Sequence, residues 1–223
     1  MPHEARTVEI RLPPFDREGI LGLPAAPPVG IVLFAHGSGS SHSSPRNLAV
    51  AESLRRAGLA FLLFDLLTEA EADERANVFD IPLLAERLDA ASSWVEMNLP
   101  GGRLPLGYFG ASTGAAAALT AAAKRRDVRA IVSRGGRPDL AGAALGAVTA
   151  ATLLIVGGDD PGVLAMNQAA CRRLRCECRL QVIPGATHLF EESGALDAVT
   201  VLARDWFLRH LHANAQEIQH AVR

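Results

Sequence analysis

The chain has 223 residues, of which 49% are hydrophobic and 21% charged, and its formal net charge at pH 7 is −2. A chain of this length can bury one substantial core, so we expect a single domain over residues 1–223. The 22 Lys and Arg residues are balanced by 24 Asp and Glu residues and never cluster beyond triplets, which argues against a nucleic-acid partner.

Two patterns bear on location. The first ten residues, MPHEARTVEI, include acidic residues and no apolar core, so they do not resemble a secretory signal. No apolar run approaches the roughly 20 residues that a membrane-spanning helix requires. We therefore expect a cytoplasmic protein without a membrane partner.

Two kinds of strand are predicted. Residues 7–13 alternate apolar and polar side chains, which indicates a strand with one solvent-exposed face. We expect this strand to pair antiparallel with residues 19–25 in a hairpin. Later segments contain short apolar runs that end in Gly, Asp, Ser or His, as parallel strands buried on both faces do. These segments are VGIVLFAHG, LAFLLFDLL, LPLGYFGAS, RAIVSRGG, ATLLIVGGDD and CRLQVIPGATH.

Helical intervals separate these strands. One has Ser44 as its expected N-cap and Pro45 at the first helical position, and it ends before Gly58. Another follows Asp80 as its expected cap, and the last covers 195–212. Alternation of this kind predicts an α/β fold with eight strands, mostly parallel, an antiparallel N-terminal hairpin and helices on both faces. Ligands of such sheets bind beyond the carboxyl ends of the strands, so functional residues are expected there.

A serine stands between two glycines at one of these strand ends. The stretch 110–114 reads Gly-Ala-Ser-Thr-Gly, directly after an apolar strand and before an alanine-rich helix. This is the context of a nucleophile elbow, in which a strained turn exposes the central residue and needs very small neighbours. We expect Ser112 to be a catalytic nucleophile.

A serine hydroxyl needs a base that is itself oriented by an acid. Asp159 and Asp160 follow a later strand and His188 follows the last one, giving the chain order Ser, Asp, His. We favour Asp160 as the acid, because it precedes Val163 by three residues in a G-x-D-x-x-V pattern. Either aspartate is also suited to cap the helix that begins near position 161.

Acyl transfer also requires hydrogen-bond donors to an oxyanion. The loop HGSGSS, which starts at His36, provides the backbone N–H of Ser38, and the residue after the nucleophile provides that of Thr113. Gly39 is the reserve donor, since glycine-rich loops can shift by one residue. His36 itself is expected to brace the loop rather than transfer protons.

Taken in this order, the segments resemble the α/β-hydrolase superfamily and, more narrowly, its dienelactone-hydrolase-like branch. The resemblance covers essentially the whole chain and rests on VGIVLFAHGSGSS, LLFDLL, GYFGASTGAAAAL, LLIVGGDD and IPGATHLF. It implies that a small-molecule ester or lactone is hydrolysed through an acyl-enzyme, without a metal or cofactor. Dienelactone hydrolases proper use a cysteine at the elbow, so Ser112 favours a general serine esterase. Residues 64–88 also resemble a subgroup sometimes joined to phosphoribosyltransferase domains.

Other functions stay open at this point. The same triad serves acyltransferases and thioesterases, and a hydrolase fold can persist as a non-catalytic binding or regulatory module. The sequence gives neither the physiological substrate nor the oligomeric state. Only one helix fits between the strands near 130 and 153, so no large lid is expected and the site should be open. Arg134 and Arg137 follow the first of these strands and could bind a substrate carboxylate, although Arg137 is also placed for a local salt bridge.

Three cysteines, Cys171, Cys176 and Cys178, lie close together. Their C-x4-C-x-C spacing matches no expected zinc ligand set, and no histidine is near. We expect reduced, structural thiols.

Overall fold

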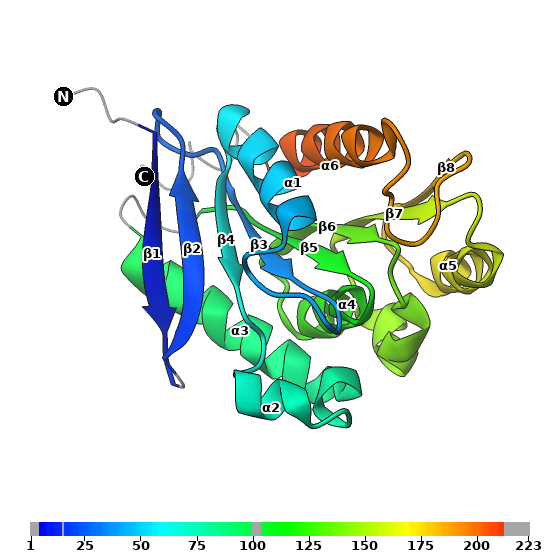
Figure 1. Ribbon diagram of the computed structural model, residues 1–223, viewed down its shortest axis with the longest axis horizontal. Helices are drawn as coiled ribbons and strands as arrows, with labels where there is room; N and C mark the ends of the chain where they lie inside the picture. The colour runs from blue at the N-terminus through cyan, green and yellow to red at the C-terminus, as the bar shows by residue number, and fades with distance from the viewer. Residues whose placement is uncertain (1–4, 15, 100–103, 212–223) are drawn as a thin grey trace, which may run out of the picture.

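The computed structural model describes residues 5–14, 16–99 and 104–211 (Figure 1). Its core is an eight-stranded sheet with the order β1-β2-β4-β3-β5-β6-β7-β8. The hairpin of β1 and β2 joins the sheet antiparallel to β4, and all other neighbours are parallel. The predicted sheet is thereby confirmed. The strands are β1 (Arg6–Leu12), β2 (Arg17–Leu23), β3 (Ile31–Ala35), β4 (Ala60–Phe64), β5 (Leu106–Ala111), β6 (Val128–Arg134), β7 (Ala151–Gly157) and β8 (Cys178–Ile183).

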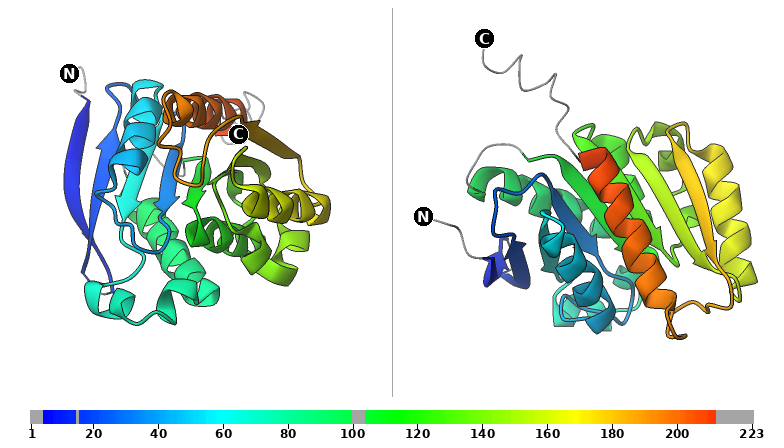
Figure 2. Two further views of the ribbon diagram at one scale, coloured as in Figure 1. Left: turned by 45° about the vertical axis from the view of Figure 1, so that its right-hand side comes forward. Right: turned by 90° about the horizontal axis from the view of Figure 1, so that it is seen from above.

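Helices cover both faces of this sheet. Helices α1 and α6 pack on one face, and α3, α4 and α5 on the other; Figure 2 shows α6 lying across the sheet on the α1 side. The helices are α1 (Pro45–Arg56), α2 (Glu69–Asp73), α3 (Ile81–Asn98), α4 (Thr113–Lys124), α5 (Pro161–Arg173) and α6 (Ala195–Leu211), with two 3₁₀ segments, η1 (Asn77–Phe79) and η2 (Pro138–Ala147).

The central strands are buried on both faces, and their alternation decides which layer each side chain joins. In β3, Ile31 and Leu33 pack with α3 and α4, whereas Val32 and Phe34 pack with α1 and α6. A fully buried aliphatic or aromatic side chain stabilises the fold by about 1.5–3 kcal/mol. Because these two clusters pack on both faces of the sheet, each loop at its carboxyl edge connects well-packed strands and helices.

The two N-caps predicted from sequence differ in outcome. The Asp80 carboxylate accepts the N–H of Leu83 at 3.0 Å and caps α3 as predicted. Ser44 occupies the position before α1, but its side chain makes no capping hydrogen bond, so that part of the prediction is wrong. Helix α6 ends at Leu211, and the last predicted helical residue lies outside the described residues.

One buried polar contact joins the sheet to α3. The hydroxyl of Tyr108 lies 2.7 Å from Ser92 Oγ, and both residues are fully buried. Burial raises the pKa of this tyrosine, so the phenol stays protonated at every ordinary pH.

The cysteines differ from expectation. Cys171 on α5 and Cys178 on β8 form a disulfide, and Cys176 is a free, partly buried thiol. The expectation of three reduced thiols is therefore wrong, because the last turn of α5 brings two of them to bonding distance. Across the described ranges, no helix has the length and apolar character needed to cross a bilayer.

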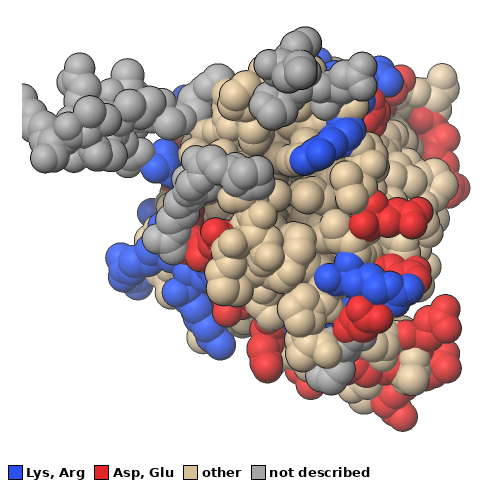
Figure 3. Space-filling model, turned by 90° about the vertical axis from the view of Figure 1, so that its left-hand side faces the viewer, with Lys and Arg blue, Asp and Glu red and all other residues tan. Residues whose placement is uncertain are grey.

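The edge of the sheet at β1 is exposed. Figure 3 views this side of the molecule and shows basic and acidic side chains with uncharged residues between them. Arg11 on β1 pairs with Asp16 in the turn at 2.9 Å and with Glu18 on β2 at 3.2 Å. Such exposed pairs contribute little to stability.

Candidate active site

Ser112 lies on a sharp turn between β5 and α4. Its backbone has φ 50° and ψ −121°, a conformation that a serine rarely adopts. The flanking glycines show why the turn needs them. A Cβ on Gly110 would lie 2.5 Å from the Cα of Ala115, and one on Gly114 would lie 2.0 Å from the carbonyl oxygen of Ala35. The predicted steric condition of the elbow is therefore present.

Backbone hydrogen bonds hold this strained turn. The N–H of Ser112 donates to the carbonyl of Arg134 at 3.3 Å, and its carbonyl accepts the N–H groups of Ala115 at 3.1 Å and Arg137 at 3.0 Å. Strain of this kind costs on the order of 1–3 kcal/mol and persists where surrounding contacts impose it. The residue is thus fixed at the carboxyl edge of the sheet.

His188 and Asp160 meet at the same edge. Asp160 follows β7, and its Oδ2 lies 2.8 Å from His188 Nδ1, in the loop after β8. The other oxygen, Oδ1, accepts the N–H of Val163 at 3.4 Å and caps α5. Asp160 therefore both contacts His188 and caps α5, whereas Asp159, the other candidate for either role, is exposed.

The loop of His188 crosses the end of β6. A Cβ on Gly135 would lie 3.1 Å from the His188 carbonyl oxygen and 3.5 Å from its Cε1. The carbonyl of Arg134, the residue before Gly135, accepts the N–H of Ser112. The side chain of His188 is 40% exposed, so it is open to a substrate, whereas that of Asp160 is 19% exposed.

The loop after β3 packs against the elbow. A Cβ on Gly37 would lie 2.8 Å from the Cβ of Ser112. Ser38 and Gly39 follow in this loop; Gly39 has φ 70° and no atoms in the way of a side chain. Thr113 begins α4, where backbone N–H groups have no acceptor within the helix. Both predicted donor segments therefore border the serine.

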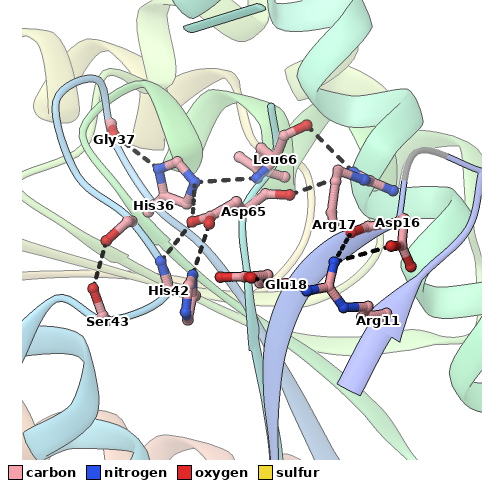
Figure 4. A network of polar contacts seen from close by, with 11 residues as sticks. Arg11, Asp16, Arg17, Glu18, His36, Gly37, His42, Ser43, Asp65 and Leu66 are labelled. Atoms are coloured by element: carbon pink, nitrogen blue, oxygen red, sulfur yellow. Dashed lines mark hydrogen bonds and ion pairs between the residues drawn. The ribbon is translucent and has the colours of Figure 1, made fainter. Parts of the chain in front are cut away.

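His36 braces the loop, as the sequence predicted. Its Nδ1 donates to the carbonyl of Gly37 at 3.0 Å, and its Nε2 accepts the N–H of Leu66 at 3.1 Å (Figure 4). These two bonds require a neutral ring with its proton on Nδ1. Burial also lowers the pKa of His36, which favours the same neutral form.

The two arginines have different surroundings. The guanidinium of Arg137 binds Asp139 through two hydrogen bonds of 2.9 and 2.7 Å, which is the local salt bridge considered from sequence. Arg134 is 8% exposed, and its Nη1 has no hydrogen-bond partner among the described residues. Burial and the nearby Arg46 lower the pKa of Arg134 to about 10, so it is still charged at pH 7.

Arg46 was not singled out from sequence. It lies in the first turn of α1 and pairs with Glu191 at 3.0 Å, three residues after His188. An arginine within a helix carries no motif, so only the packing of α1 against the His188 loop reveals it. A groove of about 380 Å³ is lined there by Arg46, Phe190, Glu191, Glu192, Ser193, Gly194, Leu196 and Asp197.

The connection between β6 and β7, all of which the structure describes, is short and holds no large lid. Only η2 lies between these strands, with a break at Gly142 where φ is 54°. This agrees with the single short helix predicted there.

A crystal structure of a dienelactone hydrolase from Anabaena variabilis is similar to this chain, with 52% identity and a TM-score of 0.87. The match covers 95% of this chain and 100% of that one. The chain belongs to the dienelactone hydrolase-like family of α/β-hydrolases. Est1E from Butyrivibrio proteoclasticus has the same fold as this chain at 17% identity, with a TM-score of 0.74. That match covers 91% of this chain and 98% of Est1E.

Curated relatives come from Mycobacterium tuberculosis and are named "Putative phosphoribosyl transferase". They are 57% identical over 211 residues, which is 94% of this chain and 47% of theirs. The chain thus spans about half the length of the curated relatives it matches. No protein-family model matches the sequence.

Proposed function

We propose that this hydrolase-family member cleaves carboxylic esters or lactones through an acyl-enzyme on Ser112. The observation that carries the proposal is the 2.8 Å contact between Asp160 and His188 at the sheet edge where Ser112 occupies its strained turn. Ser112, Asp160 and His188 follow three different strands, and the three strands are parallel, so all three residues lie at the same edge of the sheet. The 52% identity to a dienelactone hydrolase supports the same reaction class.

In the proposed reaction, His188 Nε2 accepts the proton of Ser112 as the hydroxyl attacks the substrate carbonyl. Asp160 holds the His188 proton on Nδ1 and stabilises the imidazolium that forms. The amides of Ser38 and Thr113 donate to the oxyanion, and one such donor contributes about 3 kcal/mol to the transition state. His188 then protonates the leaving alcohol, and water repeats the steps to release the acid.

We further propose that Arg134 receives an anionic group of the substrate, such as a carboxylate. A buried guanidinium N–H without an acceptor is costly, and a bound anion would supply the acceptor that Nη1 of Arg134 lacks among the described residues. Arg137 already has its carboxylate partner in Asp139 and is not proposed for this role. A hydrogen bond to a charged group contributes about 1.5–3 kcal/mol, or roughly 10- to 100-fold in affinity.

The arginine proposal is tested with p-nitrophenyl hemisuccinate and p-nitrophenyl butyrate, esters of similar length that differ in one carboxylate. Arg134→Gln should raise KM for the hemisuccinate by about 10- to 100-fold, with little change for butyrate. Arg137→Gln is the matched control and should change neither. Equal effects of Arg134→Gln on both esters would contradict anion recognition.

Acyl transfer to an alcohol, amine or thiol, and thioester hydrolysis, need the same triad and are the alternatives. The transferase name of the Mycobacterium tuberculosis relatives describes chains about twice this length, and the site described here supports acyl chemistry. A panel of p-nitrophenyl esters, lactones and thioesters, each assayed with and without competing acceptors, tests the proposal. We expect wild type to convert esters or lactones to free acids and Ser112→Ala to have no such activity. Absence of turnover on the whole panel would favour a non-catalytic module.

A further inference from the structure

A second contact between a histidine and a carboxylate lies in the loop after β3. His42 Nδ1 donates to Asp65 Oδ2 at 2.7 Å, and the backbone N–H of His42 donates to Asp65 Oδ1 at 2.7 Å (Figure 4). Asp65 directly follows β4, so the contact joins two different strand ends. Both oxygens of one carboxylate therefore hold one residue of the loop.

The Asp65 end of this contact is firmly anchored. Arg17 on β2 is 3% exposed and donates to the carbonyls of Asp65 at 3.5 Å and Leu66 at 3.3 Å. Its guanidinium also lies 5.8 Å from the ring centre of Phe64. The N–H of Asp65 donates to the carbonyl of Glu18 at 3.3 Å. The carboxylate thus projects from backbone that three contacts fix.

The other end of the loop is fixed by His36. The carbonyl of Gly37 accepts His36 Nδ1–H at 3.0 Å and the N–H of Ser40 at 3.3 Å. In a planar trans peptide the carbonyl and the next N–H point in opposite directions. Holding the Gly37 carbonyl therefore sets the direction of the Ser38 N–H. Residues 37–42 form a short span with one fastening at each end.

His42 lies beside the β1–β2 hairpin. It lines a groove of about 350 Å³, and the other lining residues come from β1 and β2: Glu9, Ile10, Arg11, Glu18, Gly19 and Ile20. None of these belongs to the candidate active site. We therefore expect any effect of His42 on the reaction to pass through the loop that carries Ser38.

We propose that Asp65 and His42 are positioning residues that hold the Ser38 N–H in place for the oxyanion before the reaction begins. The inference rests on the proposed function. Donors fixed in advance cost no reorganisation when charge develops, and loss of one donor lowers kcat by about 10²- to 10³-fold. A loosened loop keeps the donor but misplaces it, so we expect a loss of about 10- to 100-fold in kcat.

The test is a set of substitutions matched atom by atom. In His42→Asn the side-chain nitrogen occupies the place of Nδ1 and can still donate to Asp65, whereas in His42→Gln it occupies the place of Nε2 and cannot. Asp65→Asn replaces one acceptor oxygen by a donor. Ser43→Ala removes only an exposed contact with Ser41 and is the control. Each variant is compared with wild type in kcat and KM for a p-nitrophenyl ester, in affinity for a phenylboronic acid, and in amide exchange of residues 36–44.

We expect His42→Gln and Asp65→Asn to lose about 10- to 100-fold in kcat and in boronate affinity, with KM changed less than threefold. His42→Asn should recover most of both losses, and exchange in the loop should rise only in the impaired variants. Wild-type kcat in His42→Gln and Asp65→Asn would overturn the inference, and so would equal losses in His42→Asn and His42→Gln. A wild type inactive on all esters would instead refute the proposed function, while the exchange data would still show whether Asp65 and His42 fasten the loop.

Discussion

Asp160 makes two contacts, and an amide in its place can keep only one of them. Oδ2 receives His188 Nδ1–H at 2.8 Å, while Oδ1 receives the N–H of Val163 at 3.4 Å. Asparagine has one acceptor oxygen and an NH2 group that only donates. In Asp160→Asn, either the oxygen keeps the helix cap and NH2 faces the imidazole, or the oxygen turns to His188 and the cap is lost.

The magnitudes of the two outcomes differ. With NH2 opposite Nδ1, His188 must carry its proton on Nε2 and cannot accept one from Ser112, so kcat should fall by about 10³- to 10⁴-fold. Asparagine caps helices about as well as aspartate, so the free energy of unfolding should change by less than about 1 kcal/mol. Asp160→Ala removes the cap as well and should cost about 1 kcal/mol in addition to the same loss of kcat.

The assay measures kcat on a p-nitrophenyl ester and the free energy of unfolding in urea for each variant. Asp159→Asn is the control, because that side chain is exposed and should leave both quantities near wild type. The reasoning is refuted if Asp160→Asn retains kcat within tenfold of wild type and also loses no free energy of unfolding, because an amide would then keep both contacts. A deeper loss in Asp159→Asn would move the acid one residue upstream.

Three further predictions concern pH, packing and a buried hydrogen bond. The lowered pKa of His36 means that the unfolded chain binds the proton more tightly, so stability should be complete above about pH 6.5 and fall as the pH drops below it. When the free energy of unfolding is measured in urea at several pH values from 5 to 8, its change with pH should be smaller in His36→Asn than in wild type. The same change with pH in both proteins would contradict this. Gly114→Ala places a Cβ 2.0 Å from the Ala35 carbonyl oxygen, so it should lower the free energy of unfolding by at least about 1–3 kcal/mol, and a fold as stable as wild type would count against the elbow packing. Tyr108→Phe removes the 2.7 Å contact with Ser92 and should cost about 1 kcal/mol in the same measurement; a neutral effect would show that this bond adds nothing.

Much of the fold follows from local pattern. Apolar runs that end in small or polar residues mark the buried strands, and glycines at 110 and 114 mark the elbow, because each rule acts over a few residues. Because parallel strands end at one edge of the sheet, Ser112, Asp160 and His188, each of which follows such a strand, are then expected at the same edge. These are the features for which sequence neighbours supply the physical cause.

Other features depend on contacts between distant segments. Nothing near Asp65 in the chain indicates that its carboxylate binds a loop residue 23 positions away. The sequence left open which of Asp159 and Asp160 caps α5, and only the structure shows that Asp160 makes the capping contact and the His188 contact together. The disulfide between Cys171 and Cys178 depends on how α5 meets β8, which spacing alone does not give. Likewise, the unpaired Nη1 of Arg134 is visible only once the neighbouring residues that the structure describes are placed.

The central claim is that Ser112 is a nucleophile activated by His188. Its most direct test is reaction with a fluorophosphonate probe, followed by intact mass and peptide mapping of wild type, Ser112→Ala and His188→Ala. We predict one adduct in wild type, located on Ser112, none in Ser112→Ala, and labelling slowed by at least about 10²-fold in His188→Ala. Equal labelling of wild type and Ser112→Ala, or no labelling of either, would contradict the claim.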